Sequence, residues 1–234
     1  MDGFEGFARF PWRVMTEAQW LTCTDASLMA DHLHYSQMSR QPSNRRKLRL
    51  LSVACCRDLW HLFEPFPIIA ECVEFAEGYA DGIGAKKRLK KLHDENRHEY
   101  ERSDAKPGED ASVAHIASVA RRTLLEDASK TLFGEWDWRN TLRGPDGHPG
   151  QARLFRDVFG NPFRPVAFNP DWRTSTIVSI ARSMYDSRDF STIQVLADAL
   201  QDAGCANEGI LDHCREDGPH VRGCWVVDLI LGKE

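Results

Sequence analysis

One feature constrains the fold of this chain more than any other: its apolar residues recur at helical spacing. The strongest stripe advances by steps of 3, 4, 4 and 3 residues, through Leu48, Leu51, Cys55, Leu59 and Leu62. This spacing places all five side chains on one face of an α-helix. Similar stripes return over 174–185 and 191–203, whereas the alternation that is typical of strands does not persist over four residues. We therefore predict an all-α fold, an irregular bundle of about eight helices.

Glycine and proline divide the chain into parts. Residues 134–150 contain four glycines and two prolines, and no helix or strand of ordinary length fits among them. We predict an N-terminal extension over 1–14, an N-terminal helical half over 15–133, a connecting loop over 134–150 and a C-terminal helical half over 151–234. A chain of 234 residues is long enough to bury roughly 70% of its unfolded surface, so both halves can contribute to a core.

Composition narrows the class of protein. Thirty Lys and Arg against 35 Asp and Glu give a net charge of -5, which does not favour a general polyanion binder. No apolar run reaches the roughly 18 residues of a membrane helix, and the first residues lack the pattern of a secretory signal. The seven cysteines are an odd number without framework spacing, which is typical of reduced thiols. We predict a cytoplasmic protein with no membrane partner.

The C-terminal sequence concentrates the residue types that bind metals. Zinc takes four ligands from thiolate, imidazole and carboxylate groups, and four residues could supply them: Cys205, Cys214, His220 and Cys224. If the last helix begins near Pro219, then His220, Cys224 and Asp228 follow one another at i, i+4 and i+8 on a single stripe. The sequence therefore gives zinc as the one cofactor to consider, although the spacing matches no common zinc pattern.

Two other interpretations of the same residues stay open. Cysteine is among the most buried residue types, so these thiols and imidazoles would ordinarily fill the core, with Asp228 paired to an arginine. Alternatively, Cys224 in the first turn of a helix beside an imidazole would form a thiol-based site, because both neighbours lower a thiol pKa. On the ordinary interpretation, the chain has no catalytic residue and no bound cofactor.

A basic segment suggests a different kind of partner. Between Arg40 and Arg57 there are six basic residues and no acidic one. Clustered cations of this kind neutralise phosphates, which makes nucleic acid a candidate partner through Arg45, Arg46, Lys47 and Arg49. The alternatives are a solvated helix face or docking within the chain against acidic residues such as Asp198, Asp202 and Asp212. No base-reading motif accompanies the cluster.

Several segments of the chain resemble an uncharacterised family of bacterial proteins. The similar segments are MTEAQWLTCTD at 15–25, KLRLLSVACCRDLW at 47–60, LFRDVFGNPFRPV at 154–166, LADALQDAGC at 196–205 and HCREDGPHVRGCWVVDLILGKE at 213–234. The resemblance covers most of the chain from Met15 onward. It implies no activity, cofactor or catalytic residue.

Together these patterns favour a non-enzymatic, helical interaction or regulatory module whose partner is another protein. Aromatic side chains are frequent in two segments without helical periodicity, namely the first 14 residues and the region of Trp136 and Trp138. Aromatic residues of this kind are enriched in protein interfaces. The metal- or thiol-based site and nucleic-acid binding through the helix at 45–57 are the alternatives.

Overall fold

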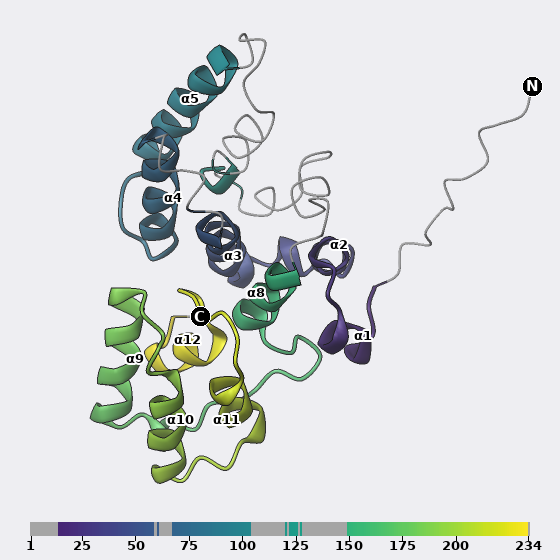
Figure 1. Ribbon diagram of the computed structural model, residues 1–234, viewed down its shortest axis with the longest axis vertical. Coiled ribbons are helices and arrows are strands. Elements are labelled where there is room, and N and C mark those ends of the chain that lie inside the picture. Colours follow the sequence, from purple (N-terminus) through teal and green to yellow (C-terminus); the bar gives the residue numbers. More distant parts are fainter. Residues whose placement is uncertain are drawn as a thin grey trace, which may run out of the picture.

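The computed structural model describes residues 14–58, 60, 67–103, 120, 122–125, 127 and 149–233. All regular secondary structure in these residues is helical (Figure 1), which confirms the predicted all-α fold. The first five helices are α1 (Glu17–Thr22), α2 (Ala26–Tyr35), α3 (Arg45–Asp58), α4 (Pro67–Ala80) and α5 (Lys86–Ser103). The later ones are α8 (Pro149–Phe159), α9 (Ser175–Ser187), α10 (Ile193–Asp202), α11 (Glu208–Arg215) and α12 (Trp225–Leu231).

Local sequence explains where several helices begin. Thr16 and Gln19 form a capping box at the start of α1, in which each side chain accepts a hydrogen bond from the other residue's backbone N–H. Asp25 caps α2 by accepting from the backbone of Ser27 and Leu28. Asn207 caps α11 in the same way. These caps satisfy N–H groups that have no partner inside the helix.

Two apolar clusters form the part of the molecule that contains α1–α5 and α8. The first joins α1, α2, α3 and α8 around Trp20 and Phe155, both fully buried. The second joins α3, α4 and α5 around Cys56, Val73 and Leu92. Helix α3 serves both clusters because it is apolar on two sides. Its predicted stripe is buried at Leu48, Leu51 and Cys55, whereas Leu59 and Leu62 lie outside the described residues.

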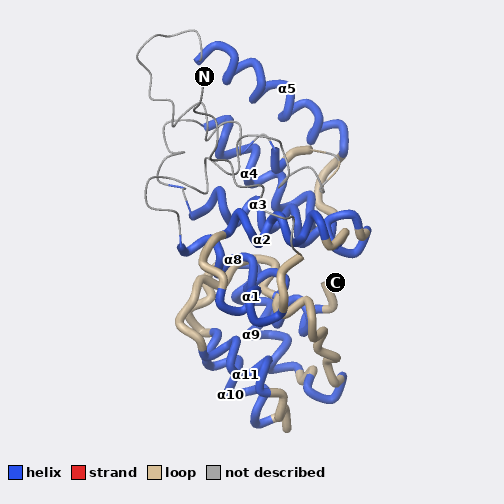
Figure 2. Tube along the Cα trace, turned by 90° about the vertical axis from the view of Figure 1, so that its right-hand side faces the viewer, coloured by secondary structure: helices blue, strands red, loops and turns tan. Residues whose placement is uncertain are grey.

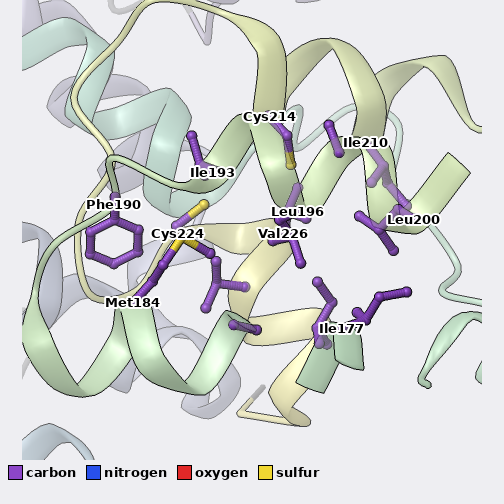
Figure 3. Close-up of a cluster of buried hydrophobic side chains, with 14 of the residues drawn as sticks. Ile177, Met184, Phe190, Ile193, Leu196, Leu200, Ile210, Cys214, Cys224 and Val226 are labelled. Carbon is purple, nitrogen blue, oxygen red and sulfur yellow. The ribbon is translucent and has the colours of Figure 1, made fainter. Parts of the chain in front are cut away.

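A third apolar cluster belongs to α9–α12. Its buried members lie between Ile177 and Ile230 and come from these four helices and the turns between them. Figure 3 shows their side chains converging from several helices, with Cys214 and Cys224 among them. In both overall views α9–α11 lie at the end of the molecule opposite α5 (Figure 1 and Figure 2). We call residues 175–233 the C-terminal unit.

The last helix begins later than the sequence pattern predicts. It begins at Trp225 rather than near Pro219, and Cys224 is its N-cap residue. Gly223 has a φ of +97°, a conformation that favours glycine and does not continue a helix, and its backbone lies against the side chain of Leu50. His220, Cys224 and Asp228 therefore do not share one helical stripe. Residues 219–224 precede the helix, with a turn at 222–223.

None of the helices in the described ranges combines the length and the apolar character that crossing a membrane requires.

Candidate metal centre

Four side chains with metal-binding atoms meet between α8 and the C-terminal unit. Asp157 lies in the last turn of α8, His213 in the last turn of α11, His220 in the segment before α12, and Cys224 at the N-cap of α12. One ligand atom from each lies within 4.8 Å of all the others. The donor set of one carboxylate, two imidazoles and one thiol contains only groups that zinc accepts.

The separations of these atoms are close to those around a tetrahedral ion. Asp157 Oδ1 lies 2.8 Å from His220 Nδ1 and 3.2 Å from His213 Nε2. Cys224 Sγ lies 3.3 Å from His213 Nε2 and 4.0 Å from His220 Nδ1. Ligands bonded to zinc at 2.0–2.3 Å in a tetrahedron stand roughly 3.3–3.8 Å apart. These four separations, 2.8 to 4.0 Å, lie on both sides of that range, and all of the ligand atoms lie within 4.8 Å of one another.

Neighbouring groups support the positions of Asp157 and the two histidines. The second carboxylate oxygen of Asp157 accepts a hydrogen bond of 3.0 Å from the backbone N–H of Val221. The ring of His213 packs edge-on against His220, with centroids 5.0 Å apart, and against Trp225 at 5.2 Å. Such supporting contacts hold a metal ligand in one orientation. Asp157 therefore directs Oδ1 toward the two imidazoles, whereas Oδ2 faces the backbone of Val221.

Burial and charge set the protonation of the cluster. Burial by itself would raise the pKa of Asp157, but hydrogen bonds from His213 and His220 lower it below its usual value. Burial by itself would lower the pKa of His220, but Asp157 raises it. Burial raises the pKa of the Cys224 thiol. Without an ion the thiol keeps its proton at neutral pH, and a divalent cation would have to displace it.

A cavity gives access to the cluster from solvent. It has a volume of about 240 Å³ and is lined by Asp157, His213 and His220, together with Arg153, Arg156 and Glu216. Nε2 of His220 is buried, and the backbone of Glu216 lies within hydrogen-bonding reach of the imidazole. Ligation through Nδ1 would place the ring proton on this Nε2. The cavity provides a path by which an ion can enter.

The geometry does not fit a thiol nucleophile. In a catalytic triad the base contacts the nucleophile with one ring nitrogen and the acid with the other. Here Nε2 of His213 faces both Cys224 Sγ and Asp157 Oδ1. The side chain of Cys224 is fully buried, and its thiol pKa is raised, whereas reactive cysteines are accessible and have a lowered thiol pKa. The arrangement favours a ligand set over a reactive thiol.

The structure brings together some of the predicted zinc ligands and separates others. His220 and Cys224 belong to the cluster. Cys205 and Cys214 lie in the apolar cluster of the C-terminal unit, where burial raises the pKa of the Cys214 thiol to about 12.

The sequence reasoning missed Asp157 and His213 as ligands. For Asp157 the available signal was an acidic residue between Phe155 and Val158 in an apolar stripe.

The basic helix α3 uses two of its four candidate nucleic-acid residues inside the protein. Arg46 donates to Asp81 at 3.0 Å, to Asp228 at 2.5 Å and to the hydroxyl of Tyr185 at 2.7 Å. Arg49 is 4% exposed and donates to the backbone carbonyls of Thr123 and Leu125. Arg45 is exposed and Lys47 half-buried.

Two of the acidic residues singled out in the sequence pair with arginines, whereas the aromatic residues singled out there lie outside the described part of the chain. Asp228 pairs with Arg46 of α3, and the acidic side chain of Asp198 contacts Arg215 within the C-terminal unit. Phe4, Phe7, Phe10, Trp12, Trp136 and Trp138 lie outside the described residues.

No protein-family model, curated protein or solved structure matches this chain. The functional assignment therefore depends on the geometry of the cluster formed by Asp157, His213, His220 and Cys224.

Proposed function

We propose that this protein binds one zinc ion through Asp157, His213, His220 and Cys224, and that the ion stabilises the fold. The observation that carries the proposal is the convergence of four ligand atoms, all within 4.8 Å of one another, from α8, α11 and the segment before α12. A mixture of thiolate, imidazole and carboxylate is typical of zinc. Ligands of magnesium or calcium would be oxygen atoms.

The number of ligands favours a structural ion. Structural zinc sites have four protein ligands, whereas catalytic sites keep one position for water or substrate. All four donors here are protein side chains, and the side chains of Asp157 and Cys224 are almost completely buried. A structural ion requires no enzymatic activity. The proposal is therefore compatible with a non-enzymatic interaction module, whose protein partner stays a prediction.

Elemental analysis tests the proposal directly. Purified protein is loaded with zinc, passed through a desalting column and analysed for zinc per chain. We expect one ion per wild-type chain, and we expect Cys224→Ala and His213→Ala to weaken zinc binding by at least about tenfold in competition with a chromophoric chelator.

Cys214→Ala is the matched control for these variants. It removes a thiol as deeply buried as that of Cys224 from the same apolar cluster, but outside the ligand set. It should retain one zinc ion per chain, with circular dichroism verifying the helical content of every variant. Wild-type protein without stoichiometric zinc would refute the proposal, and so would equal loss of zinc in Cys214→Ala and Cys224→Ala.

A further inference from the structure

The C-terminal unit packs its apolar core within itself. The buried members of its cluster come from 177–230, and those of the neighbouring cluster come from α1, α2, α3 and α8. The two parts are also separate in Figure 1, where α9–α11 of the C-terminal unit lie below α3 and α8. Apolar contacts between the described residues of these two parts include Leu50 against Gly223 and Trp225 against Gly160, with Val221 packed on the cluster of α8.

Charged and polar groups make several of the described contacts between the two parts. Glu77 of α4 forms ion pairs with Arg188 at 2.5 Å and Arg222 at 3.4 Å. Asp228 of α12 pairs with Arg46 at 2.5 Å, and Tyr185 donates to Asp81 at 2.6 Å. Interfaces of this polar type are typical of parts of a chain that move relative to one another. The carboxylates of Glu77 and Asp228 are buried in these pairs, so salt screens them less than it screens exposed pairs.

The metal ligands are divided between these same two parts. His213, His220 and Cys224 belong to the C-terminal unit, whereas Asp157 belongs to α8. Helix α8 is held in the other part because Phe155 and Val158 are fully buried in the cluster with α2 and α3. An ion bound by all four ligands would therefore join the two parts directly.

The segment between α8 and α9 has the properties of a hinge. Gly160 has a φ of +62°, and its carbonyl accepts a hydrogen bond of 2.9 Å from Trp20, which holds the start of the segment in place. Residues 161–174 contain one short 3-10 turn at Pro170–Trp172 and are mostly exposed. Asn161 and Arg164 bind Glu17 of α1, whereas Phe168 and Trp172 pack against the apolar cluster of the C-terminal unit. The change from one part to the other therefore falls between residues 164 and 168.

From this division of ligands we infer that zinc controls the docking of the C-terminal unit: the bound ion fixes the unit against α8 through Asp157, and loss of the ion releases it about residues 161–174. This inference rests on the proposed zinc site. Zinc would then regulate the protein, because the zinc concentration would set the fraction of molecules in which the polar interface is exposed.

The test measures zinc binding and docking in the same samples of full-length protein. Small-angle X-ray scattering gives the radius of gyration, and hydrogen exchange gives the protection of residues 219–224. Both are measured with saturating zinc or with a chelator, in 0.5 M NaCl to weaken the exposed ion pairs (roughly a 4 Å Debye length). We expect zinc to decrease the radius of gyration of the wild type and to slow exchange in 219–224 by at least about tenfold.

Two variants separate docking from metal binding. Asp157→Ala keeps the three ligands of the C-terminal unit, so at saturating zinc it should still bind the ion but should show neither the compaction nor the slowed exchange. Asp212→Ala removes an exposed acid of α11 outside the cluster and should respond to zinc as the wild type does.

The outcomes distinguish the two proposals. Zinc binding by the wild type without compaction or slowed exchange would overturn the docking inference and leave the zinc site intact. Zinc-dependent compaction of Asp157→Ala equal to that of the wild type would also overturn it. Failure of the wild type to bind zinc would overturn both proposals.

Discussion

Replacing the buried carboxylate of Glu77 is the most demanding test of the polar interface. Its side chain is 2% exposed and contacts three guanidinium groups: Arg188 at 2.5 Å, Arg57 at 3.0 Å and Arg222 at 3.4 Å. Glu77→Gln keeps the shape of the side chain but removes the negative charge that these arginines share. The variant therefore isolates the electrostatic contribution of this carboxylate.

The expected loss of stability in Glu77→Gln follows from the burial of this carboxylate. Removing one partner of a buried ion pair costs about 3–5 kcal/mol, because the other charge stays unpaired. The three arginine side chains are 43%, 25% and 16% exposed, so water can partly solvate them, and we expect a loss of about 2–4 kcal/mol. For a chain of this length each kcal/mol lowers the melting temperature by about 2–4 °C. Thermal unfolding followed by circular dichroism should therefore shift downward by about 5–15 °C.

Glu71→Gln is the matched control. Glu71 also lies on α4 and also pairs with an arginine, Arg88, but its side chain is 49% exposed. An exposed pair of this kind contributes at most about 1 kcal/mol. A shift of the Glu77→Gln melting temperature no larger than that of Glu71→Gln would refute the reasoning.

The pH dependence supplies a second signature of Glu77. Burial alone would raise the pKa of this carboxyl, but hydrogen bonds from Arg188 and Arg57 lower it below its ordinary value of 4.5. A lowered folded-state pKa means that the stabilisation is complete above the unfolded-state pKa and is lost as the pH falls through the folded-state pKa. The difference in stability between wild type and Glu77→Gln should therefore be largest near pH 7 and shrink below about pH 4.5.

Two further substitutions, followed by urea unfolding, test the contact of Gly223 with α3 and the hydrogen bond between Trp20 and Gly160. Gly223→Ala places a methyl group 3.0 Å from Leu50 at a φ of +97° and should lower the free energy of unfolding by about 2–4 kcal/mol. Its control is Gly204→Ala, at a φ of +86° with no atom within 4 Å, which should lower it by about 1 kcal/mol. Equal losses in the two variants would contradict a close contact between Gly223 and Leu50. Trp20→Phe leaves the carbonyl of Gly160 without its hydrogen bond of 2.9 Å and should cost about 1–3 kcal/mol. A loss below about 0.5 kcal/mol would show that this bond does not contribute to stability.

Local patterns predicted the helices well. The spacing of Leu48, Leu51 and Cys55 indicated the buried face of α3, and Thr16 with Gln19 indicated the start of α1. Both signals involve residues within about one or two turns, where helical geometry fixes the neighbours. The second apolar face of α3 was not predicted, because its partners on α4 and α5 are set by tertiary packing.

The candidate site was only partly predictable because its ligands come from distant segments. His220 and Cys224 stand in a conspicuous sequence, but Asp157 lies 63 residues before His220, and no periodicity relates the two positions. The expected helical stripe through His220 and Asp228 was wrong because Gly223 adopts a positive φ and α12 begins at Trp225.

The basic helix shows a similar limit of sequence reasoning. A local excess of cations indicated a nucleic-acid surface, but the count of charges within one segment does not include acids elsewhere in the chain. Arg46 finds Asp228 at a separation of 182 residues, and the sequence carries no signal of that pairing. Which part of a charged helix faces solvent is decided by tertiary packing.

Anomalous diffraction from crystals of zinc-loaded protein, recorded on both sides of the zinc absorption edge, tests the central claim most directly. We predict one anomalous peak at about 2.0–2.3 Å from Asp157 Oδ1, His213 Nε2, His220 Nδ1 and Cys224 Sγ. A zinc peak bound by other side chains, or fully loaded crystals without a peak among these four atoms, would contradict the account.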